Sequence, residues 1–120
     1  MDGPSGVKPD VMGELRRRLK HERGRLLRTV VRTDDELATL EAHQPGATVE
    51  DAAAGLAASI LSRLEGQERH ELDEIDAAQA RLEAGTFGTC ERCGQPIPLR
   101  RLRAIPVTRY CLPCQTKEER

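Results

Sequence analysis

Two pairs of cysteines stand out as the residues most able to do chemistry. All four cysteines of the chain lie in Cys-x-x-Cys pairs, Cys90 with Cys93 and Cys111 with Cys114, and seventeen residues separate the two pairs. Thiolates spaced in this way can converge on one ion, and two such pairs complete a closed tetrahedron around zinc. The spacing therefore predicts one structural Zn²⁺ bound by all four cysteines.

Two other interpretations of the cysteines remain open at this point, namely two disulfides or a redox-active pair. Disulfides are typical of oxidising compartments, whereas this sequence opens with no apolar leader and is expected to be cytoplasmic. A redox Cys-x-x-Cys normally lies between a strand and a helix, a context that the surrounding residues do not suggest. Zinc is the favoured interpretation.

The residues around the cysteines predict a small module that needs its metal. The only two aromatic residues, Phe87 and Tyr110, flank the two pairs. We expect them to form a core with the nearby aliphatic residues Ile97, Leu99, Leu102 and Ile105. A core of this size is too small to stand without a metal. The arginines among these residues, Arg100, Arg101 and Arg103, form either a contact patch or a charge that compensates the zinc–thiolate centre.

Other catalytic constellations are absent from the sequence, so we do not expect an enzyme. His21, His43 and His70 are scattered, without a cysteine at ligand spacing, and are expected to be surface residues. No glycine-rich phosphate loop is present. Aromatic residues make up 2% of the chain, which argues against a deep aromatic-lined pocket.

The residues before the cysteines predict two long helices. Between Asp10 and about Ala42 apolar residues recur with helical spacing, at Met12, Leu15, Leu19, Leu26, Val30, Leu37 and Leu40. Between Thr48 and about Ala84 a second stripe holds Ala53, Ala57, Ile60 and Leu64, then Leu72, Ile75, Ala78 and Leu82. A phase slip near Gln67, beside Gly66, weakens the case for an unbroken helix there. Gly85 is the expected stop.

Pro45 and Gly46 between the stripes predict that the chain folds back on itself. The expected fold is mainly α, with a long antiparallel helical hairpin (a coiled coil) followed by a small four-cysteine zinc finger; an intermolecular coiled coil is the alternative. Each helix would be roughly 50 Å long. The expected segments are a disordered N-terminus at 1–9, the hairpin at 10–85 with its tip at about 43–51, and the finger at 86–120 with a C-terminal helix.

Charge and hydropathy exclude several classes of partner. Residues 34–83 carry thirteen acidic side chains against three arginines, which would repel DNA, so no sequence-specific DNA binding is expected. The flanking segments are basic, which suits a basic arm packed on an acidic arm as well as it suits solvated helix faces. No apolar run is long enough to span a bilayer. We expect a cytoplasmic monomer that does not bind membranes.

The finger resembles a known family. Phe87-Gly88-Thr89-Cys90, Cys93-Gly94, Arg101-Leu102, Ala104, Pro106 and Cys111-x-x-Cys114-Gln115 are similar to the DksA/TraR C4-type zinc finger. Members of that family are bacterial transcription factors that bind RNA polymerase and insert a hairpin tip into its secondary channel, without needing a DNA site. The resemblance therefore implies a polymerase-binding regulator that modulates initiation.

The tip departs from the family motif. Family tips carry Asp-x-x-Asp-x-Ala about 40 residues before the first cysteine, where this chain has Ala47-Thr48-Val49-Glu50-Asp51-Ala52. Glu50 keeps one carboxylate, Asp51 adds another out of register, and Ala47 replaces the first Asp. Glu50 and Asp51 are therefore the expected tip residues, with helix capping as their other interpretation. A ppGpp site is not carried over from the resemblance, and the sequence does not determine whether a nucleotide co-regulator is used.

Two functions remain open from the sequence. The first is the polymerase-binding regulator that acts through its tip. The second is a zinc-stabilised adaptor or nucleic-acid-associated module that acts through Arg100, Arg101 and Arg103. Binding to DNA in a salt-dependent manner would favour the second.

Overall fold

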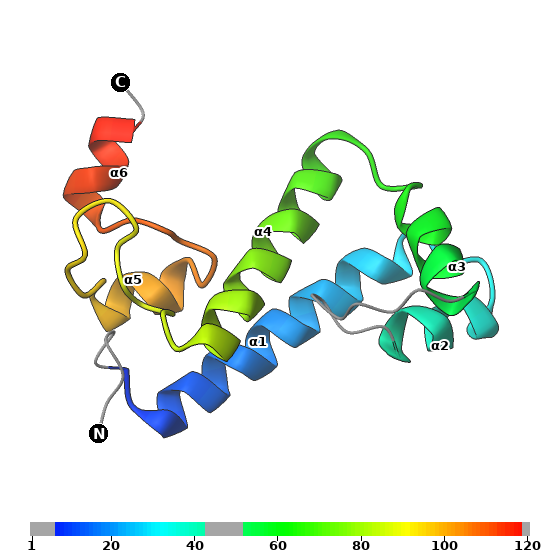
Figure 1. Ribbon diagram of the computed structural model, residues 1–120, viewed down its shortest axis with the longest axis horizontal. Helices are drawn as coiled ribbons and strands as arrows, with labels where there is room; N and C mark the ends of the chain where they lie inside the picture. The colour runs from blue at the N-terminus through cyan, green and yellow to red at the C-terminus, as the bar shows by residue number, and fades with distance from the viewer. Residues whose placement is uncertain (1–6, 43–51, 119–120) are drawn as a thin grey trace. The chain divides into compact units, whose positions relative to one another are not determined.

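The structure, a computed structural model, describes residues 7–42 and 52–118. Its helices are α1 (Pro9–Arg28), α2 (Asp34–Ala42), α3 (Ala52–Leu61), α4 (Gly66–Ala84), α5 (Leu99–Ala104) and α6 (Leu112–Glu118) (Figure 1). Within the described ranges the β structure is a single bridge between Thr89 and Pro96. The predicted mainly helical fold is confirmed. None of the helices described is long and apolar enough to cross a membrane.

The prediction of two unbroken helices is wrong. The first arm stops at Arg28 and starts again at Asp34, and the second arm stops at Leu61 and starts again at Gly66. The longest helix, α1, has 20 residues, so neither arm contains a continuous helix of roughly 50 Å. Apolar periodicity continues across both interruptions, which is why the pattern alone does not reveal them.

Local hydrogen bonding explains where the first arm breaks. The backbone N–H groups of Thr29 and Val30 donate to carbonyls three residues back, at Leu26 and Leu27, which tightens and ends α1. The hydroxyl of Thr33 then accepts from the N–H of Glu36 at 3.1 Å, while the Glu36 carboxylate accepts from the N–H of Arg32 at 2.8 Å. This reciprocal pattern is close to a capping box and starts α2.

The second arm breaks where the apolar pattern slips. Residues 62–65 connect α3 to α4, and Gly66 begins α4 with φ of +56°, a conformation that other residues rarely adopt. The slip and the glycine are the two sequence features that weakened the case for an unbroken helix. They therefore marked the interruption within a few residues.

The apolar stripes form the buried face of the arms. In the second arm Ala57, Ile60, Leu64, Leu72, Ile75, Ala78 and Leu82 are all buried. In the first arm Leu15, Leu19, Leu26 and Leu40 are buried, together with Val11 and Leu27, which the predicted stripe omitted. Met12, Val30 and Leu37 are half-buried.

Arg23 occupies the gap that the stripe leaves between Leu19 and Leu26. Only 8% of its surface is exposed, and its Nε donates to Asp76 Oδ1 at 2.9 Å. Burial raises the pKa of Asp76, although Arg23 acts in the opposite direction. A charged pair therefore takes the place of an apolar contact in the seam.

The described chain divides into two compact units. Unit 1 comprises residues 1–19 and 77–120, and unit 2 comprises residues 20–76. The division runs through α1 and α4, whereas the sequence analysis placed a boundary at residue 85. Within unit 1, polar contacts join the first part of α1 to the finger, including Arg103 Nε to Glu14 Oε2 at 3.1 Å and a bond from Arg18 to the carbonyl of Arg103.

Residues 7–9, which belong to the segment 1–9 expected to be disordered, have defined contacts. Val7 is buried, the N–H of Met12 donates to the carbonyl of Lys8 at 2.9 Å, and α1 begins at Pro9. Proline fits the first turn because the N–H that it lacks would have no partner within the helix. Residues 1–6 lie outside the described residues.

Candidate metal centre

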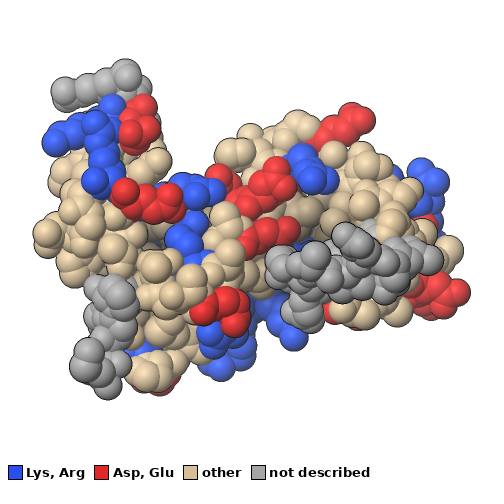
Figure 2. All heavy atoms as spheres, in the orientation of Figure 1, with Lys and Arg blue, Asp and Glu red and all other residues tan. Residues whose placement is uncertain are grey.

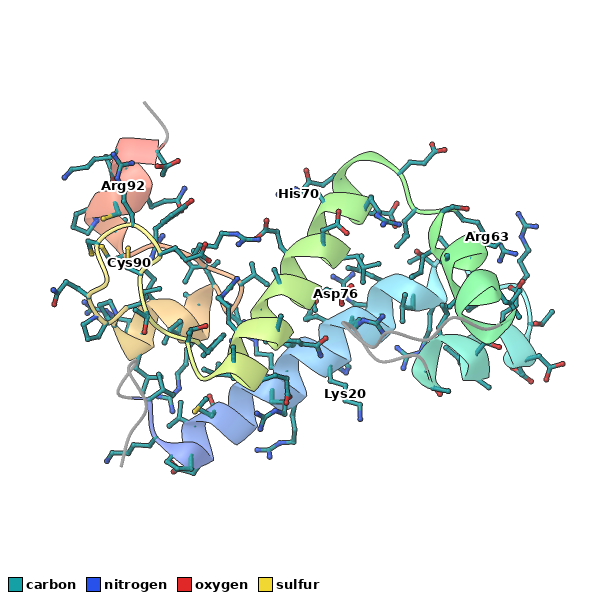
Figure 3. All side chains as sticks on the ribbon, in the orientation of Figure 1. Lys20, Arg63, His70, Asp76, Cys90 and Arg92 are labelled. Carbon is teal, nitrogen blue, oxygen red and sulfur yellow. The ribbon has the colours of Figure 1, made fainter. Side chains whose placement is uncertain are left out.

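The four cysteines come together at one point in unit 1. Their sulfur atoms all lie within 4.8 Å of one another, and no disulfide joins them. Cys90 and Cys114 are buried, Cys111 is half-buried and Cys93 is exposed. Figure 3 labels Cys90 on the loop that follows α4.

The sulfur spacing fits zinc and excludes a disulfide. Cys93 Sγ and Cys111 Sγ are 3.8 Å apart, far beyond the roughly 2.05 Å of a disulfide bond. With Zn–S bonds of about 2.3 Å, two ligands of a tetrahedral site are separated by about 3.8 Å. The cluster therefore has the size of a zinc–thiolate tetrahedron before any metal is considered.

Glycine geometry builds the first cysteine loop. The N–H of Gly94 donates to the carbonyl of Cys90 at 2.9 Å and closes the turn that brings Cys93 back toward Cys90. Gly94 has φ of +77°, where a side chain would be strained. The N–H of Cys90 donates to the carbonyl of Gln95 at 2.9 Å, which fixes the strand-like return of the loop.

The second cysteine pair lies at the start of a helix. Cys111 directly precedes α6 and Cys114 lies in its first turn, where the N–H of Gln115 donates to the carbonyl of Cys111 at 2.9 Å. One helical turn places residues three apart on the same face, so both thiols point toward the first loop. The two pairs thus reach the same centre by different local structures.

Glu91 joins the two cysteine pairs. Its N–H donates to the carbonyl of Arg109 at 2.8 Å, and its Oε2 accepts from Arg109 Nη1 at 3.3 Å. Arg81 Nη1 of α4 lies 3.6 Å from the same carboxylate oxygen. Sequence reasoning missed this contact because no spacing rule connects a residue inside the first cysteine pair with one on a helix before it.

The electrostatics of the centre favour a bound cation. Burial disfavours the thiolate of Cys90, but backbone N–H groups of Cys93, Cys111 and Arg92 donate to its sulfur and lower its pKa to about 6. Hydrogen bonding with Cys111, burial and the other two sulfurs raise the pKa of Cys114 to about 12. Neighbouring thiols thus cannot all lose their protons together, and a divalent ion would supply the missing positive charge.

The finger core is smaller than expected. Phe87 and Leu102 are fully buried and Ile97 is 3% exposed. Leu99 and Ile105, which the sequence analysis placed in the core, are 38% and 43% exposed. They lie at the ends of the short helix α5, where one face alone meets the core, so they contribute little to it.

Two of the three candidate contact arginines have partners inside unit 1. Arg101 Nε donates to the carbonyl of Tyr110 at 3.0 Å, and Arg103 pairs with Glu14. Arg100 is exposed. The charged side chains of the face drawn in Figure 2 are of mixed sign, with acidic residues gathered along α4. These arginines therefore do not form a single free patch.

Glu50 and Asp51 lie outside the described residues, and so does His43. His21 and His70 are exposed, which confirms them as surface residues.

Comparisons with known proteins agree with the metal centre. Residues 85–120 match the family described as "Prokaryotic dksA/traR C4-type zinc finger". With the sulfur cluster, this match shows a zinc-finger protein with one structural zinc.

Individual relatives extend the similarity beyond the finger. An uncharacterized protein of Aquifex aeolicus is 51% identical over 61 residues, which cover 51% of this chain and 42% of that protein. The RNA polymerase-binding transcription factor DksA of Haemophilus influenzae is 33% identical over 92 residues, covering 77% of this chain and 60% of that protein. The chain thus matches about half the length of these two relatives.

A solved structure matches the fold over most of the chain. The transcription factor DksA2 from Pseudomonas aeruginosa aligns with a TM-score of 0.61 and 28% sequence identity, and the alignment covers 93% of this chain and 85% of that one. The similarity therefore includes the helical arms as well as the finger.

Proposed function

Because the chain belongs to the DksA/TraR family of C4-type zinc-finger proteins, we propose that it is a transcription regulator that binds bacterial RNA polymerase directly. The observation that carries the proposal is the match over 77% of the chain to a protein named as an RNA polymerase-binding transcription factor. This share extends well beyond the zinc finger into the arms. The regulator acts in the cytoplasm as a monomer and has no catalytic site of its own.

The tip of the arms is the segment between α2 and α3. The helices α2 and α3 lead into and out of residues 43–51, which carry Glu50 and Asp51. We propose that this tip enters the polymerase secondary channel and brings a carboxylate toward the catalytic Mg²⁺. A carboxylate near a metal changes its coordination and the local potential, which can alter initiation.

In this proposal the zinc has a structural role. Cys90, Cys93, Cys111 and Cys114 are its ligands, and the ion supplies the folding free energy that the small core around Phe87 and Leu102 lacks. The closed set of four sulfurs leaves no open position for a substrate.

The experiment is a binding assay followed by transcription assays at several promoters. The wild type is expected to bind purified RNA polymerase, and Glu50→Gln with Asp51→Asn is expected to keep binding while changing transcription. Asp10→Asn with Glu83→Gln is the matched control, because it removes two exposed acidic charges away from the tip. Equal output from the tip variant and the wild type would contradict the tip mechanism.

A failure of the wild type to bind polymerase would contradict the proposal as a whole. The adaptor or nucleic-acid interpretation would then predict salt-dependent DNA binding that Arg100→Ala weakens. The internal partners of Arg101 and Arg103 count against this interpretation, because they reduce the basic surface available to a nucleic acid.

A further inference from the structure

The two interruptions of the arms lie against each other in unit 2. Residues 29–33 separate α1 from α2, and residues 62–65 separate α3 from α4. The side chain of Arg63, in the second interruption, donates to the backbone carbonyl of Val30 in the first one. This joint is the feature of the fold that apolar periodicity does not explain.

Arg63 is the centre of the joint. Its Nη1 donates to the carbonyl of Val30 at 2.9 Å and to Glu36 Oε1 at 2.8 Å, and its Nη2 donates to Glu36 Oε2 at 2.8 Å. One guanidinium from the second interruption thus holds both the backbone of the first interruption and the first turn of α2. Figure 3 labels Arg63 at the end of α3.

Glu36 is held from both sides. Its carboxylate accepts the fork of Arg63 and the N–H of Arg32, while its own N–H donates to the Thr33 hydroxyl. The side chains of Arg63 and Glu36 are 25% and 17% exposed, so water competes less here than at an ordinary surface pair. The hydrogen bonds from Arg63 and Arg32 lower the pKa of Glu36 to about 2, so it stays ionised.

Two weaker contacts add the start of α4 to the joint. The hydroxyl of Thr29 lies 2.6 Å from the carbonyl of Leu26 and 3.2 Å from Glu68 Oε2, and Arg69 Nη1 donates to the carbonyl of Leu61 at 3.3 Å. The Leu61 carbonyl lies in the last turn of α3 and also accepts from the N–H of Leu64 at 3.0 Å. Each of the four helices of unit 2 therefore has an end at this joint.

Beyond the joint, α2 and α3 pack on each other as a pair. Leu40 of α2 and Ala57 and Ile60 of α3 are buried. A pair of helices of 9 and 10 residues is too short to be stable without its connections. The contacts at the joint are therefore the ones that can fix the direction of α2 and α3.

We propose that Arg63 and Glu36 are a positioning pair that fixes the direction of α2 and α3 relative to the adjoining parts of α1 and α4 in unit 2. This proposal rests on the proposed function for its consequence, which is that the pair presents the segment between α2 and α3 to RNA polymerase. Neither residue needs to touch the polymerase.

The fork of the arginine is the feature that the joint requires. Arg63 reaches two carboxylate oxygens and one carbonyl through two nitrogens of a rigid plane. A lysine at this position would keep the charge but offer a single nitrogen. Arg63→Lys keeps the charge and loses the fork, whereas Arg63→Met loses both. Comparing the two variants therefore separates the effect of the charge on the direction of the helices from the effect of the fork.

The first experiment measures direction without polymerase. Spin labels are attached through unnatural ketone side chains at positions 41 and 70, which are exposed on α2 and α4, so that the four cysteines stay bound to zinc. The wild type should give a narrow distance distribution, and Arg63→Met, Arg63→Lys and Glu36→Gln should broaden it. Circular dichroism checks that each variant keeps its helices.

The matched control is Arg25→Met. Arg25 also pairs with a glutamate, Glu22, at 3.0 Å, but both residues lie on α1 and are exposed. The distance distribution of Arg25→Met should match that of the wild type. An unchanged distribution in Arg63→Met would overturn the positioning role, and a normal distribution in Arg63→Lys alone would reduce it to simple charge attraction and overturn the requirement for the fork.

The second experiment measures polymerase binding of the same variants. If the competent direction falls to about one tenth of the population in Arg63→Met, its apparent Kd should rise about tenfold. Unchanged binding and transcription despite a broadened distribution would overturn the consequence for presentation. If the wild type itself does not bind polymerase, the proposed function fails, whereas the distance distributions still decide whether the pair sets direction.

Discussion

Exposure differs among the four sulfur ligands, and Cys93 is the one that solvent reaches. We predict that Cys93→Ser loses its zinc and the structure of residues 86–115, because a serine hydroxyl is a poor ligand and the small core cannot fold alone. The helices of unit 2 should persist. Elemental analysis and residue-resolved hydrogen exchange measure both effects.

Gln95→Ser is the control for this variant. Gln95 is exposed beside the same loop, and its contribution to the cysteine loop is the backbone carbonyl that accepts from Cys90. The Gln95→Ser variant should retain one zinc per chain. Stoichiometric zinc in Cys93→Ser would contradict the four-thiolate site.

We predict that the stability of unit 2 depends on pH through Glu36. Its pKa falls from an ordinary 4.5 to about 2 through hydrogen bonds from Arg63 and Arg32, so its contribution to stability is complete above about pH 4.5. The contribution is lost as the pH falls from about 4.5 toward 2, because the unfolded chain takes up a proton first. Wild type and Glu36→Gln should therefore differ most above pH 4.5 and converge near pH 2.

This comparison is best followed by NMR at unit 2 amides, because acid also releases zinc from the finger. Glu41→Gln, an exposed change on the same helix, should not alter the pH dependence. A constant difference between wild type and Glu36→Gln across this pH range would show that the carboxylate charge does not stabilise the joint.

At the scale of the elements, the seam of the arms contains a charged pair. Arg23 and Asp76 are partly buried and bonded to each other, and burial already raises the pKa of Asp76. We predict that Arg23→Leu alone destabilises the protein by about 1–3 kcal/mol, because Asp76 loses its partner. Arg23→Leu with Asp76→Leu should be as stable as the wild type or more stable.

Urea unfolding of the single and double variants measures this difference. Arg25→Leu, which breaks an exposed pair on α1, should change stability by less than about 1 kcal/mol. A double variant that is less stable than Arg23→Leu would mean that the charged pair stabilises the seam beyond what apolar packing can replace.

The sequence allowed the seam to be predicted better than the helix ends. The positions of the second stripe from Ala57 to Leu82 are buried because burial follows directly from apolar periodicity. The break before Asp34 was missed because Val30 and Leu37 continue the period across it. The signal was the Thr33-x-x-Glu36 pattern, which starts a helix by side-chain hydrogen bonds and leaves no trace in hydropathy.

The zinc ligands could be predicted from the sequence, whereas the charged contacts around them could not. The ligands follow from a fixed spacing of one residue type, which local turns enforce. Glu91 with Arg81 and Arg23 with Asp76 are contacts between residues distant in sequence, and charged residues occur throughout the chain. Without coordinates, nothing distinguishes these pairs from the solvated ones.

At the scale of the whole molecule, each of the two compact units has its own buried residues and its own cross-links. The bonds Arg63–Glu36, Arg23–Asp76 and Thr29–Glu68 all join residues of unit 2. We predict that removing zinc with a chelator raises hydrogen exchange in unit 1 and leaves most protection in unit 2. Hydrogen exchange with mass spectrometry measures both units in one sample.

Readdition of zinc should restore protection to unit 1, which is the control for damage by the chelator. Simultaneous loss of protection in both units would mean that the chain unfolds as one cooperative body. The finger would then stabilise the arms as well as itself.

The aligned interruptions also make the far part of the arms exchangeable. Residues 34–61 begin at a helix start set by Thr33 and end before the turn that contains Arg63, so both cuts fall outside regular helix. A segment transplanted between these two points would need to preserve Glu36 and the buried residues Leu40, Ala57 and Ile60. We therefore expect that this chain can act as a scaffold for chimaeras. The tips of its relatives could be grafted between these points and compared in one zinc-bound protein.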